Sequence, residues 1–383
     1  MFDPKIRFKL FKKHNYFCSA PWNLLYVGVD GKIQICTKSG INLNGDLTNS
    51  SIEEILNSKD YQNLRRDILD DKITHNCQDC LKHENIVHGK KFSSIRNHYN
   101  NLSKFNSVDH TDITKFNLAA VDLHWSSICD LKCITCWAKQ SSSIAREQNQ
   151  SVIHTPTEIA NKIINYIVNN QSELKEIYLS GGEPTLIKHN LKLLKQIEKT
   201  PDLQLRVNSN LQWNKDNPII KEILKFPNVM FTCSIDGIGK KFEYIRRNGQ
   251  WKKFVENLDY LNEHSNVDIR GNTVFFVLTA QELPQIIDFM VENYKSIDHT
   301  VNLIGMGKTF LRARNLPESV KEKSYKNLEI SLEKYKDNLS ISGCIKNCLY
   351  EIETANSEDY KEYLDQIDKL QGSSWRSLYP ELE

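Results

Sequence analysis

Three cysteines lie close together in the segment SSICDLKCITCWAK, Ser126 to Lys139. They are Cys129, Cys133 and Cys136, separated by three and then two residues. A structural zinc site takes four ligands, usually as two pairs, and no fourth Cys or His stands beside these three. Three thiolates can instead hold three corners of an iron-sulfur cube and leave its fourth iron open to a ligand from outside the protein. The spacing therefore favours a cluster with one open iron.

The surrounding sequence alternates short β-rich runs with helix-length amphipathic runs from about residue 116 onward. The predicted strands are 116–125, 174–180, 203–209, 228–235, 267–278 and 299–305. The clearest helix is predicted to start at Thr155 and Pro156, with Glu158 completing a capping box. Strands that alternate with helices imply a parallel α/β sheet, either closed or open. Because the cysteine segment follows the first strand, it lies at the carboxyl edge of the sheet, where such folds bind ligands.

The cysteine spacing is the pattern of the radical S-adenosylmethionine superfamily, and three later segments resemble that family's motifs in the same order. SGGEP, after the second strand, resembles the Gly-Gly-Glu motif whose backbone receives the amino group of the cofactor. NSNL, after the third, resembles the Thr-Asn turn, with Ser209 in the Thr place. SIDG, after the fourth, resembles the Ser-x-Asp-Gly segment near the cofactor ribose and carboxylate. The resemblance assigns cofactor binding to Gly181, Gly182, Glu183, Pro184, Ser209, Asn210, Ser234 and Asp236.

This resemblance covers roughly residues 116–310 and implies a partial (β/α)6 TIM-like barrel. In the family, the open iron of the three-cysteine 4Fe-4S cluster chelates S-adenosyl-L-methionine, and one electron from the reduced cluster cleaves it. The 5'-deoxyadenosyl radical that forms abstracts hydrogen from the substrate. The resemblance thus makes Cys129, Cys133 and Cys136 the catalytic cluster ligands and implies a low-potential electron donor such as flavodoxin or ferredoxin. One departure is Thr135, which stands where many members carry an aromatic that shields the adenine, with Trp137 following.

A second complete ligand set lies in the first quarter of the chain. It comprises Cys18, Cys36, Cys77 and Cys80. Spacing alone allows a structural zinc site. With DGKIQIC, GDLTNSSIEEILNS and LRRDIL, however, the arrangement resembles the twitch or SPASM domain, which binds an auxiliary 4Fe-4S cluster and usually follows the barrel rather than preceding it. Four protein ligands leave no iron open, which favours an electron-relay or structural role.

We therefore expect three parts. Residues 1–110 are predicted to form the auxiliary-cluster domain, 111–310 the radical S-adenosylmethionine core, and 311–383 a helical C-terminal extension. The 50 Lys and Arg residues nearly balance the 48 Asp and Glu residues, which gives no signal for nucleic-acid binding. No apolar run reaches the roughly 20 residues of a bilayer helix, and the N-terminus lacks the apolar centre of a signal peptide, so no membrane and a cytoplasmic location are expected.

The first hypothesis is an oxidoreductase of this superfamily that acts on a peptide or a small polar molecule. One alternative is a ribosomal-peptide epimerase, which needs a cysteine as hydrogen donor, such as Cys344 or Cys348. Another is a non-catalytic binding protein in which zinc holds both cysteine groups. Arg246 or Arg247 is expected to hold a carboxylate or phosphate, or else to lie on a solvated helix face, and Cys233 is expected in the core.

Overall fold

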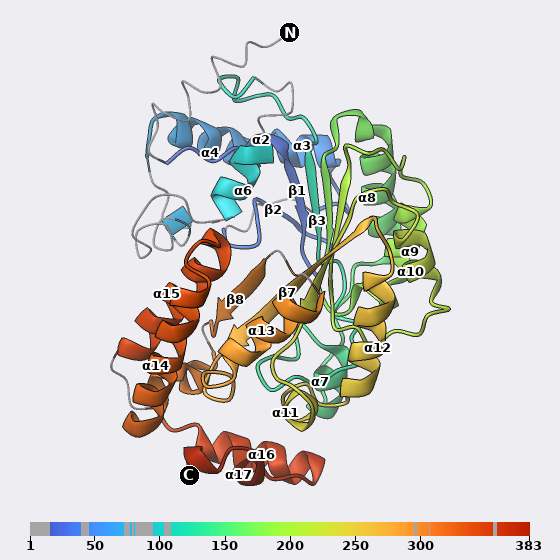
Figure 1. The fold of residues 1–383 in the computed structure, drawn as a ribbon. Helices are drawn as coiled ribbons and strands as arrows, with labels where there is room; N and C mark the ends of the chain where they lie inside the picture. The colour runs from blue at the N-terminus through green and yellow to red at the C-terminus, as the bar shows by residue number, and fades with distance from the viewer. Residues whose placement is uncertain are drawn as a thin grey trace. The chain divides into compact units, whose positions relative to one another are not determined.

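The computed structural model describes residues 16–39, 46–72, 77–78, 80, 95–102, 109–294, 296, 298–305, 307–354 and 358–383. Its strands are β1 Leu24–Val27, β2 Ile33–Gln34, β3 Ala120–Leu123, β4 Glu176–Leu179, β5 Gln204–Ser209, β6 Val229–Ser234, β7 Val267–Phe275 and β8 His299–Leu303 (Figure 1). The helices before β6 are α2 Ala20–Asn23, α3 Ile52–Leu56, α4 Lys59–Leu69, α6 Ile95–Leu102, α7 Ser142–Glu147, α8 Thr157–Asn169, α9 Lys188–Leu194 and α10 Pro218–Ile223.

The helices after β6 are α11 Lys240–Ile245, α12 Trp251–Asn262, α13 Leu283–Tyr294, α14 Glu318–Lys334, α15 Leu339–Glu353, α16 Lys361–Gln371 and α17 Trp375–Leu378. The 3-10 helices are η3 Gln171–Glu173, η4 Pro184–Leu186, η5 Thr309–Leu311, η6 Ala313–Asn315 and η7 Pro380–Leu382. The alternation of strands and helices from β3 onward confirms the predicted α/β class. Helices α14 to α17 confirm the helical C-terminal region.

The strands form one sheet in the order β2-β1-β3-β4-β5-β6-β7-β8. The pairs β1–β3, β3–β4, β4–β5 and β7–β8 are parallel, whereas β2 is antiparallel to β1. Parallel neighbours joined through helices confirm the expected sheet, which is consistent with a partial barrel. The β1–β2 hairpin lies within the residues expected to form the N-terminal auxiliary-cluster domain. The structure adds that β1 continues the sheet, because it pairs with β3 along its whole length.

The start of α8 differs from the prediction. The helix begins at Thr157 with Pro156 as its N-cap and has no side-chain capping bond, so the capping box expected with Glu158 is absent. Thr155 is fully buried, and its Cγ2 would lie 2.8 Å from a Cβ placed on Gly31, in the β1–β2 turn. Packing of Thr155 beneath this turn has taken the place of helix capping.

The chain divides into two compact units. The first comprises Met1–Ile128, Ser151–Val207 and Asp216–Val229, and the second comprises Cys129–Gln150, Asn208–Lys215 and Met230–Glu383. The loop with the three close cysteines therefore belongs to the second unit. The Gly-Gly-Glu segment and the four N-terminal cysteines belong to the first. The boundaries expected at residues 110 and 310 stay a prediction.

In the first unit, the two faces of the sheet have opposite character. Leu25, Val121, Ile177 and Leu205 stand in register on one face, and all four are buried. Helices α8, α9 and α10 lie side by side along the strands of this unit (Figure 1). Because side chains alternate along a strand, the adjacent positions face the other way.

That other face carries a polar row. Tyr26 pairs with Asp122, Asp122 with Tyr178, and Tyr178 with Arg206, so the four side chains stand in register across β1, β3, β4 and β5. Asp122 is 1% exposed. A buried charge on a sheet face is unfavourable unless it is paired or has a function. The polar row therefore points to the functional side of this unit.

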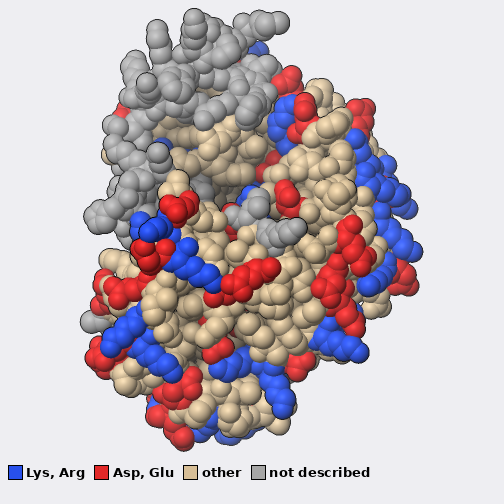
Figure 2. All heavy atoms as spheres, in the orientation of Figure 1, with Lys and Arg blue, Asp and Glu red and all other residues tan. Residues whose placement is uncertain are grey.

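In the second unit, helices cover the strands at its edge. Helices α12 and α13 pack against β7, α15 packs against β8, and α14 packs against α15 (Figure 1). Phe275, Leu283, Ile287, Ile341 and Ile345 belong to the core between them. On the face shown in Figure 2, basic and acidic side chains are interspersed over the coloured residues, as the near-balanced composition predicts. Within the described ranges, no helix is both long enough and apolar enough to cross a membrane.

Arg65 on α4 organises the N-terminal part of the first unit. Its guanidinium donates to the Pro21 carbonyl through Nε at 3.0 Å and Nη2 at 2.7 Å. It also donates to the Ile113 carbonyl at 2.8 Å and to the Leu56 carbonyl at 2.8 Å. The side chain is fully buried, and burial lowers the pKa of Arg65 to about 10. One cation thus satisfies carbonyl groups from three separate segments.

We predict that Arg65→Met lowers the free energy of unfolding by about 3 kcal/mol, because three buried carbonyls lose their donor. Urea denaturation followed by circular dichroism measures this change. Arg66→Met is the matched control, since Arg66 is the next residue on the same helix, is exposed and donates to Asn63. Equal stability of the two variants would contradict the role given to Arg65.

Candidate functional site

The three close cysteines lie on the loop between β3 and α7, and all are half-buried. The Cys129 N–H donates to Ser142 Oγ at 3.1 Å. The hydroxyls of Ser142 and Ser143 donate to the Cys129 carbonyl at 3.1 and 2.8 Å. The Cys136 N–H donates to the Cys133 carbonyl at 3.0 Å and closes a turn. The start of α7 therefore fixes one end of the loop, and the turn fixes the spacing of the other two thiols.

A second segment, Ile245 to Arg247, fixes the middle of the loop. The Lys132 N–H donates to the Arg247 carbonyl at 3.0 Å, and the Ile134 N–H donates to the Ile245 carbonyl at 2.9 Å. Glu147, the last residue of α7, accepts two bonds from Arg247 at 3.0 and 2.7 Å and one from Lys132 at 3.0 Å. The hydrogen bond from Arg247 holds the pKa of Glu147 below its ordinary value, although burial opposes this.

Arg246 and Asp236 form a buried ion pair. Arg246 Nη1 donates to Asp236 Oδ2 at 2.6 Å, and the Val274 N–H donates to Asp236 Oδ1 at 2.8 Å. Burial opposes the charge of the guanidinium, but Cys133 and Asp236 still raise the pKa of Arg246. Asp236, expected near the cofactor, therefore has a protein partner on each carboxylate oxygen. Arg246 and Arg247 are both buried and hold internal carboxylates, so the expectation of a solvated helix face is wrong.

The environment of the loop thiols fits a metal centre bound through thiolates. Burial raises the pKa of Cys133 to about 12, while Arg246 lowers it and Cys136 raises it. Burial also raises the pKa of Cys136, which Lys308 and Arg246 lower. Thiols that resist ionisation without a metal become thiolates when a metal binds them, because the metal supplies the compensating positive charge. The three thiols and two cations nearby suit an iron-sulfur cluster.

The turns that follow β5 and β6 meet the cysteine loop within the second unit. Asn210 Nδ2 donates to Asp130 Oδ1 at 2.7 Å, and Asp130 lies between the first two cysteines. Ser209 is buried beside Asn210, and the Ser234 hydroxyl donates to Asn208 Oδ1 at 3.3 Å. The structure thus brings the predicted turns to the cysteine loop. Sequence reasoning missed Asp130, although its place inside the Cys-x-x-x-Cys spacing was a signal.

The Gly-Gly-Glu segment of the first unit is a tight turn after β4. Gly181 has a φ of +101°, a conformation that favours glycine. The Gly182 N–H donates to the Ser126 carbonyl at 2.9 Å, and the Glu183 N–H donates to the Ile128 carbonyl at 2.7 Å. A Cβ on Gly182 would lie 2.2 Å from the Ile128 carbonyl oxygen. Only glycine allows the two backbones to approach this closely.

The carboxylate of Glu183 has a structural partner. Its Oε1 accepts from the Thr185 N–H at 3.2 Å and from the Thr185 hydroxyl at 2.8 Å, which caps η4. Glu183 and Pro184 are both buried. An incoming amino group is a donor, so the groups of this turn that can receive it are its backbone carbonyl oxygens and the carboxylate of Glu183.

The four N-terminal cysteines interact electrostatically within the first unit. Burial raises the pKa of Cys18 well above its ordinary value, and Cys36, Cys80 and Cys77 raise it further. Burial raises the pKa of Cys36 to about 12, and Cys80 and Cys77 add to this. Four thiols that would repel one another as thiolates fit a cationic metal centre by their donor chemistry. Within the described ranges, no three His, Cys, Asp or Glu side chains are arranged around a single metal ion.

His124 extends the polar row of the first unit. Its Nε2 lies 3.0 Å from Asp122 Oδ1. Its ring centroid lies 5.1 Å from that of Tyr26 and 6.4 Å from that of Tyr178. The Arg206 guanidinium stacks over the Tyr178 ring at 4.6 Å. Of the residues that end the first predicted strand, His124 therefore joins the polar face.

The remaining cysteines lie in packed surroundings. Cys233 and Cys348 are 0% exposed, which confirms the expectation for Cys233. Cys344 is half-buried on α15, one helical turn before Cys348. Burial raises the pKa of Cys344 to about 11. These positions favour packing over exchange of hydrogen with a substrate.

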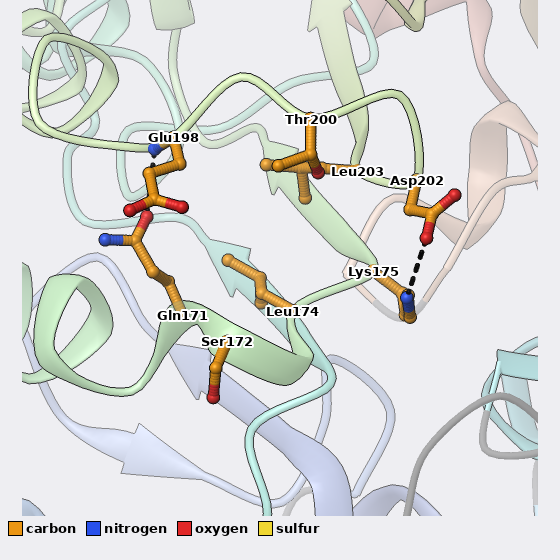
Figure 3. A pocket seen from close by; sticks show the side chains of 8 residues that line it. All are labelled: Gln171, Ser172, Leu174, Lys175, Glu198, Thr200, Asp202 and Leu203. Atoms are coloured by element: carbon orange, nitrogen blue, oxygen red, sulfur yellow. Dashed lines mark hydrogen bonds and ion pairs between the residues drawn. The ribbon is translucent and has the colours of Figure 1, made fainter.

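A cavity of about 170 Å³ lies where the chain enters β4 and β5 (Figure 3). Lys175 Nζ pairs with Asp202 at 3.4 Å, and Gln171 Oε1 accepts from the Glu198 N–H at 2.9 Å. The other lining residues are Ser172, Leu174, Thr200 and Leu203. It lies at the amino ends of these strands and contains no residue of the predicted site. Parallel α/β folds bind their ligands at the opposite edge, at the carboxyl ends of the strands.

Comparison with known proteins gives two family matches. Residues 123–290 match the family model of the Radical SAM superfamily, and residues 18–81 match that of SPASM, an iron-sulfur cluster-binding domain. No curated protein matches the chain. The second match confirms an auxiliary-cluster domain ahead of the core and spans Cys18, Cys36, Cys77 and Cys80.

Several solved structures are similar. The crystal structure of Streptococcus suis SuiB bound to S-adenosylmethionine is 17% identical, covers 75% of this chain and 61% of that chain, and has a TM-score of 0.43. The crystal structure of SuiB bound to precursor peptide SuiA is 19% identical and has a TM-score of 0.41. The match covers 63% of this chain and 49% of the SuiB chain. Native anSMEcpe with bound AdoMet is 15% identical, covers 67% of each chain, and has a TM-score of 0.43. The match to SuiB spans only half to three fifths of its length.

The two family matches imply a 4Fe-4S cluster with S-adenosyl-L-methionine in the core and an auxiliary cluster at the N-terminus. The chain therefore carries a radical SAM domain at residues 123–290 and a SPASM iron-sulfur cluster-binding domain at residues 18–81.

Proposed function

We propose that this chain is an oxidoreductase that reductively cleaves S-adenosyl-L-methionine to a 5'-deoxyadenosyl radical, which abstracts hydrogen from a peptide or small polar substrate. The observation that carries the proposal is the cysteine loop. Its three thiols are fixed by main-chain bonds at both ends and in the middle, and Arg246 lies within electrostatic range of Cys133 and Cys129. Flavodoxin or ferredoxin is the proposed electron donor.

In this proposal each part of the site has one task. Cys129, Cys133 and Cys136 hold the 4Fe-4S cluster. The turn Gly181–Pro184 offers backbone carbonyls to the amino group of the cofactor, because its N–H groups already bond to Ser126 and Ile128. Asp236 keeps Arg246 in place. The remaining cofactor contacts are assigned to Ser209, Asn210 and Ser234. The Asn210–Asp130 bond joins the turn after β5 to the loop, and the Ser234–Asn208 bond joins the end of β6 to the end of β5.

The polar row supports a polar substrate. Tyr26, Asp122, Tyr178 and Arg206 stand in register on one sheet face, and His124 lies against three of them. Such a face offers donors, acceptors and both charge signs to a bound molecule. A peptide backbone or an amino-acid-like metabolite carries matching groups, whereas a lipid chain does not.

The auxiliary cluster is assigned to Cys18, Cys36, Cys77 and Cys80. Four protein thiolates leave no iron for substrate, so we assign it electron transfer or structural support. The alternative of an epimerase needs a thiol that can reach a substrate radical. Cys348 is buried in the core, and Cys344 is half-buried and interacts with the Val301 backbone of β8, so neither thiol favours it.

The Cys129→Ala/Cys133→Ala/Cys136→Ala variant tests the central proposal. Anaerobically reconstituted wild-type protein should convert S-adenosyl-L-methionine with dithionite into 5'-deoxyadenosine, measured by liquid chromatography and mass spectrometry. The variant should fall to the protein-free background, because no thiolate remains to hold the cluster. Cys344→Ala, which removes a half-buried thiol elsewhere in the second unit, should keep the wild-type rate. Cleavage by the triple variant at the wild-type rate would refute the proposal.

Cys18→Ala/Cys36→Ala tests the auxiliary site separately. Iron per chain should fall by about half relative to wild type, because one of two 4Fe-4S clusters loses two ligands. Colorimetric iron assay and plasma mass spectrometry for zinc measure the outcome in the same samples. If the variant keeps the iron content of wild type but loses one zinc ion per chain that the wild type holds, the four cysteines bind zinc.

Gly182→Ala tests the turn. The added Cβ would overlap the Ile128 carbonyl, next to Cys129, so the turn must move. We expect 5'-deoxyadenosine formation to fall about 100-fold, since small displacements of a reacting group have effects of this size. Gly305→Ala is the matched control, because a Cβ there meets nothing within 4 Å. If the two variants are equally active, the close approach at Gly182 is not required.

A further inference from the structure

Lys308 contacts the cysteine loop from a distant part of the second unit. Its Nζ donates to the Ile134 carbonyl at 2.7 Å, to the Cys136 carbonyl at 2.6 Å and to the Tyr363 hydroxyl at 2.8 Å. These bonds use all three protons of the ammonium. The residue follows β8, in the stretch that leads to η5, and none of the sequence motifs includes it.

Tyr363 on α16 completes this contact. Its hydroxyl donates to the Ile134 carbonyl at 3.0 Å, so this carbonyl accepts from both side chains. The Lys308 Nζ lies 4.9 Å from the centre of the Tyr363 ring, within cation–π range. Phe310 packs edge-on against the same ring at 5.2 Å. Tyr363 of α16, packed on Phe310 of η5, thus holds the ammonium in one place.

The position of the ammonium matters because of the neighbouring thiols. Cys136 and Cys133 both interact electrostatically with Lys308. Gly307, the residue before Lys308, lies beside Trp137, where a Cβ would come 3.4 Å from the indole ring. A half-buried cation beside thiolates interacts more strongly than one in water, because the local dielectric is lower.

We propose that Lys308, oriented by Tyr363, is a positioning residue that fixes the Cys133–Cys136 part of the loop and raises the reduction potential of the cluster bound there. The proposal rests on the proposed function, since it requires the cluster. Adding an electron makes the cluster more negative. A fixed positive charge favours that state, and cluster potential responds to nearby charge and hydrogen bonding. The C-terminal region, which carries Tyr363, would then tune the redox centre of the core.

Lys308→Met removes the charge and its three bonds, whereas Lys308→Arg keeps the charge. We expect Lys308→Met to bind iron as wild type does but to shift its potential to a more negative value. At a fixed potential, its ratio of reduced to oxidised cluster should fall about tenfold, which corresponds to about 59 mV for a one-electron couple. Redox titration followed by electron paramagnetic resonance measures this ratio. The titration is done in the Cys18→Ala/Cys36→Ala background, which leaves the loop cluster as the reporting centre.

Lys308→Arg should restore most of the potential. Tyr363→Phe should give a smaller negative shift, because the ammonium remains but loses one of its three acceptors. Lys241→Met is the matched control. Lys241 is also partly buried, stacks on a tyrosine, Tyr379, at 4.7 Å, and pairs with Glu282 at 2.6 Å. Its loss should leave the potential unchanged.

The outcomes separate the two proposals. If wild-type protein binds no cluster through Cys129, Cys133 and Cys136, the proposed function fails. If it binds one and Lys308→Met titrates at the wild-type potential, or if Lys308→Arg shifts as far as Lys308→Met, the inference fails while the proposed function stands. If Lys308→Met alone loses iron, Lys308→Arg and Tyr363→Phe still test the inference, because both keep a positive charge at this position. Lys308→Arg must then titrate close to the wild-type potential, and Tyr363→Phe must titrate at a more negative one.

Discussion

Thiols that are buried and close together resist ionisation, and this constraint shapes both cysteine groups. Burial raises the pKa of Cys133 and Cys136 in the second unit, and of Cys18 and Cys36 in the first. A metal centre removes the conflict, because its positive charge holds the thiolates together. Without that charge the thiols stay protonated, and no attraction between thiolates and a cation holds each group together. The backbone around each group must therefore hold the thiols in place by other means.

The two groups meet this constraint differently. Around the cysteine loop, cationic side chains assist: Arg246 lowers the pKa of Cys133, and Lys308 and Arg246 lower that of Cys136. Around Cys18 the opposing influence is a hydrogen bond from the Ala20 backbone, and around Cys36 bonds from the Lys38 backbone and Ser39. A centre beside cations accepts an electron more readily than one beside neutral dipoles. We therefore expect clusters bound at the two sites to differ in reduction potential.

Much of the site could be predicted from the sequence because the signals are local. Strand patterns place each motif just after a strand, and parallel strands bring their ends to one edge. Lys308, Tyr363 and Arg65 could not be predicted in this way. Lys308 lies 172 residues from Cys136, and Tyr363 lies 229 residues from Ile134. Contacts between residues this far apart depend on how the fold packs. A single sequence shows no local pattern that predicts them. Thr155 likewise carries a capping signal that packing against Gly31 overrides.

Asp236, a motif residue, has a structural role in the second unit. Its Oδ2 accepts from Arg246 and its Oδ1 from the Val274 N–H, so the carboxylate is held rigidly. Each carboxylate oxygen has two lone pairs, which leaves room for one further donor on each. Arg246 in turn interacts with Cys133 and Cys129. A ligand hydroxyl bound by Asp236 would therefore be coupled, through one guanidinium, to the thiols of the loop. Removal of Asp236 would leave Arg246 buried and unpaired, a larger perturbation than the loss of one ligand contact.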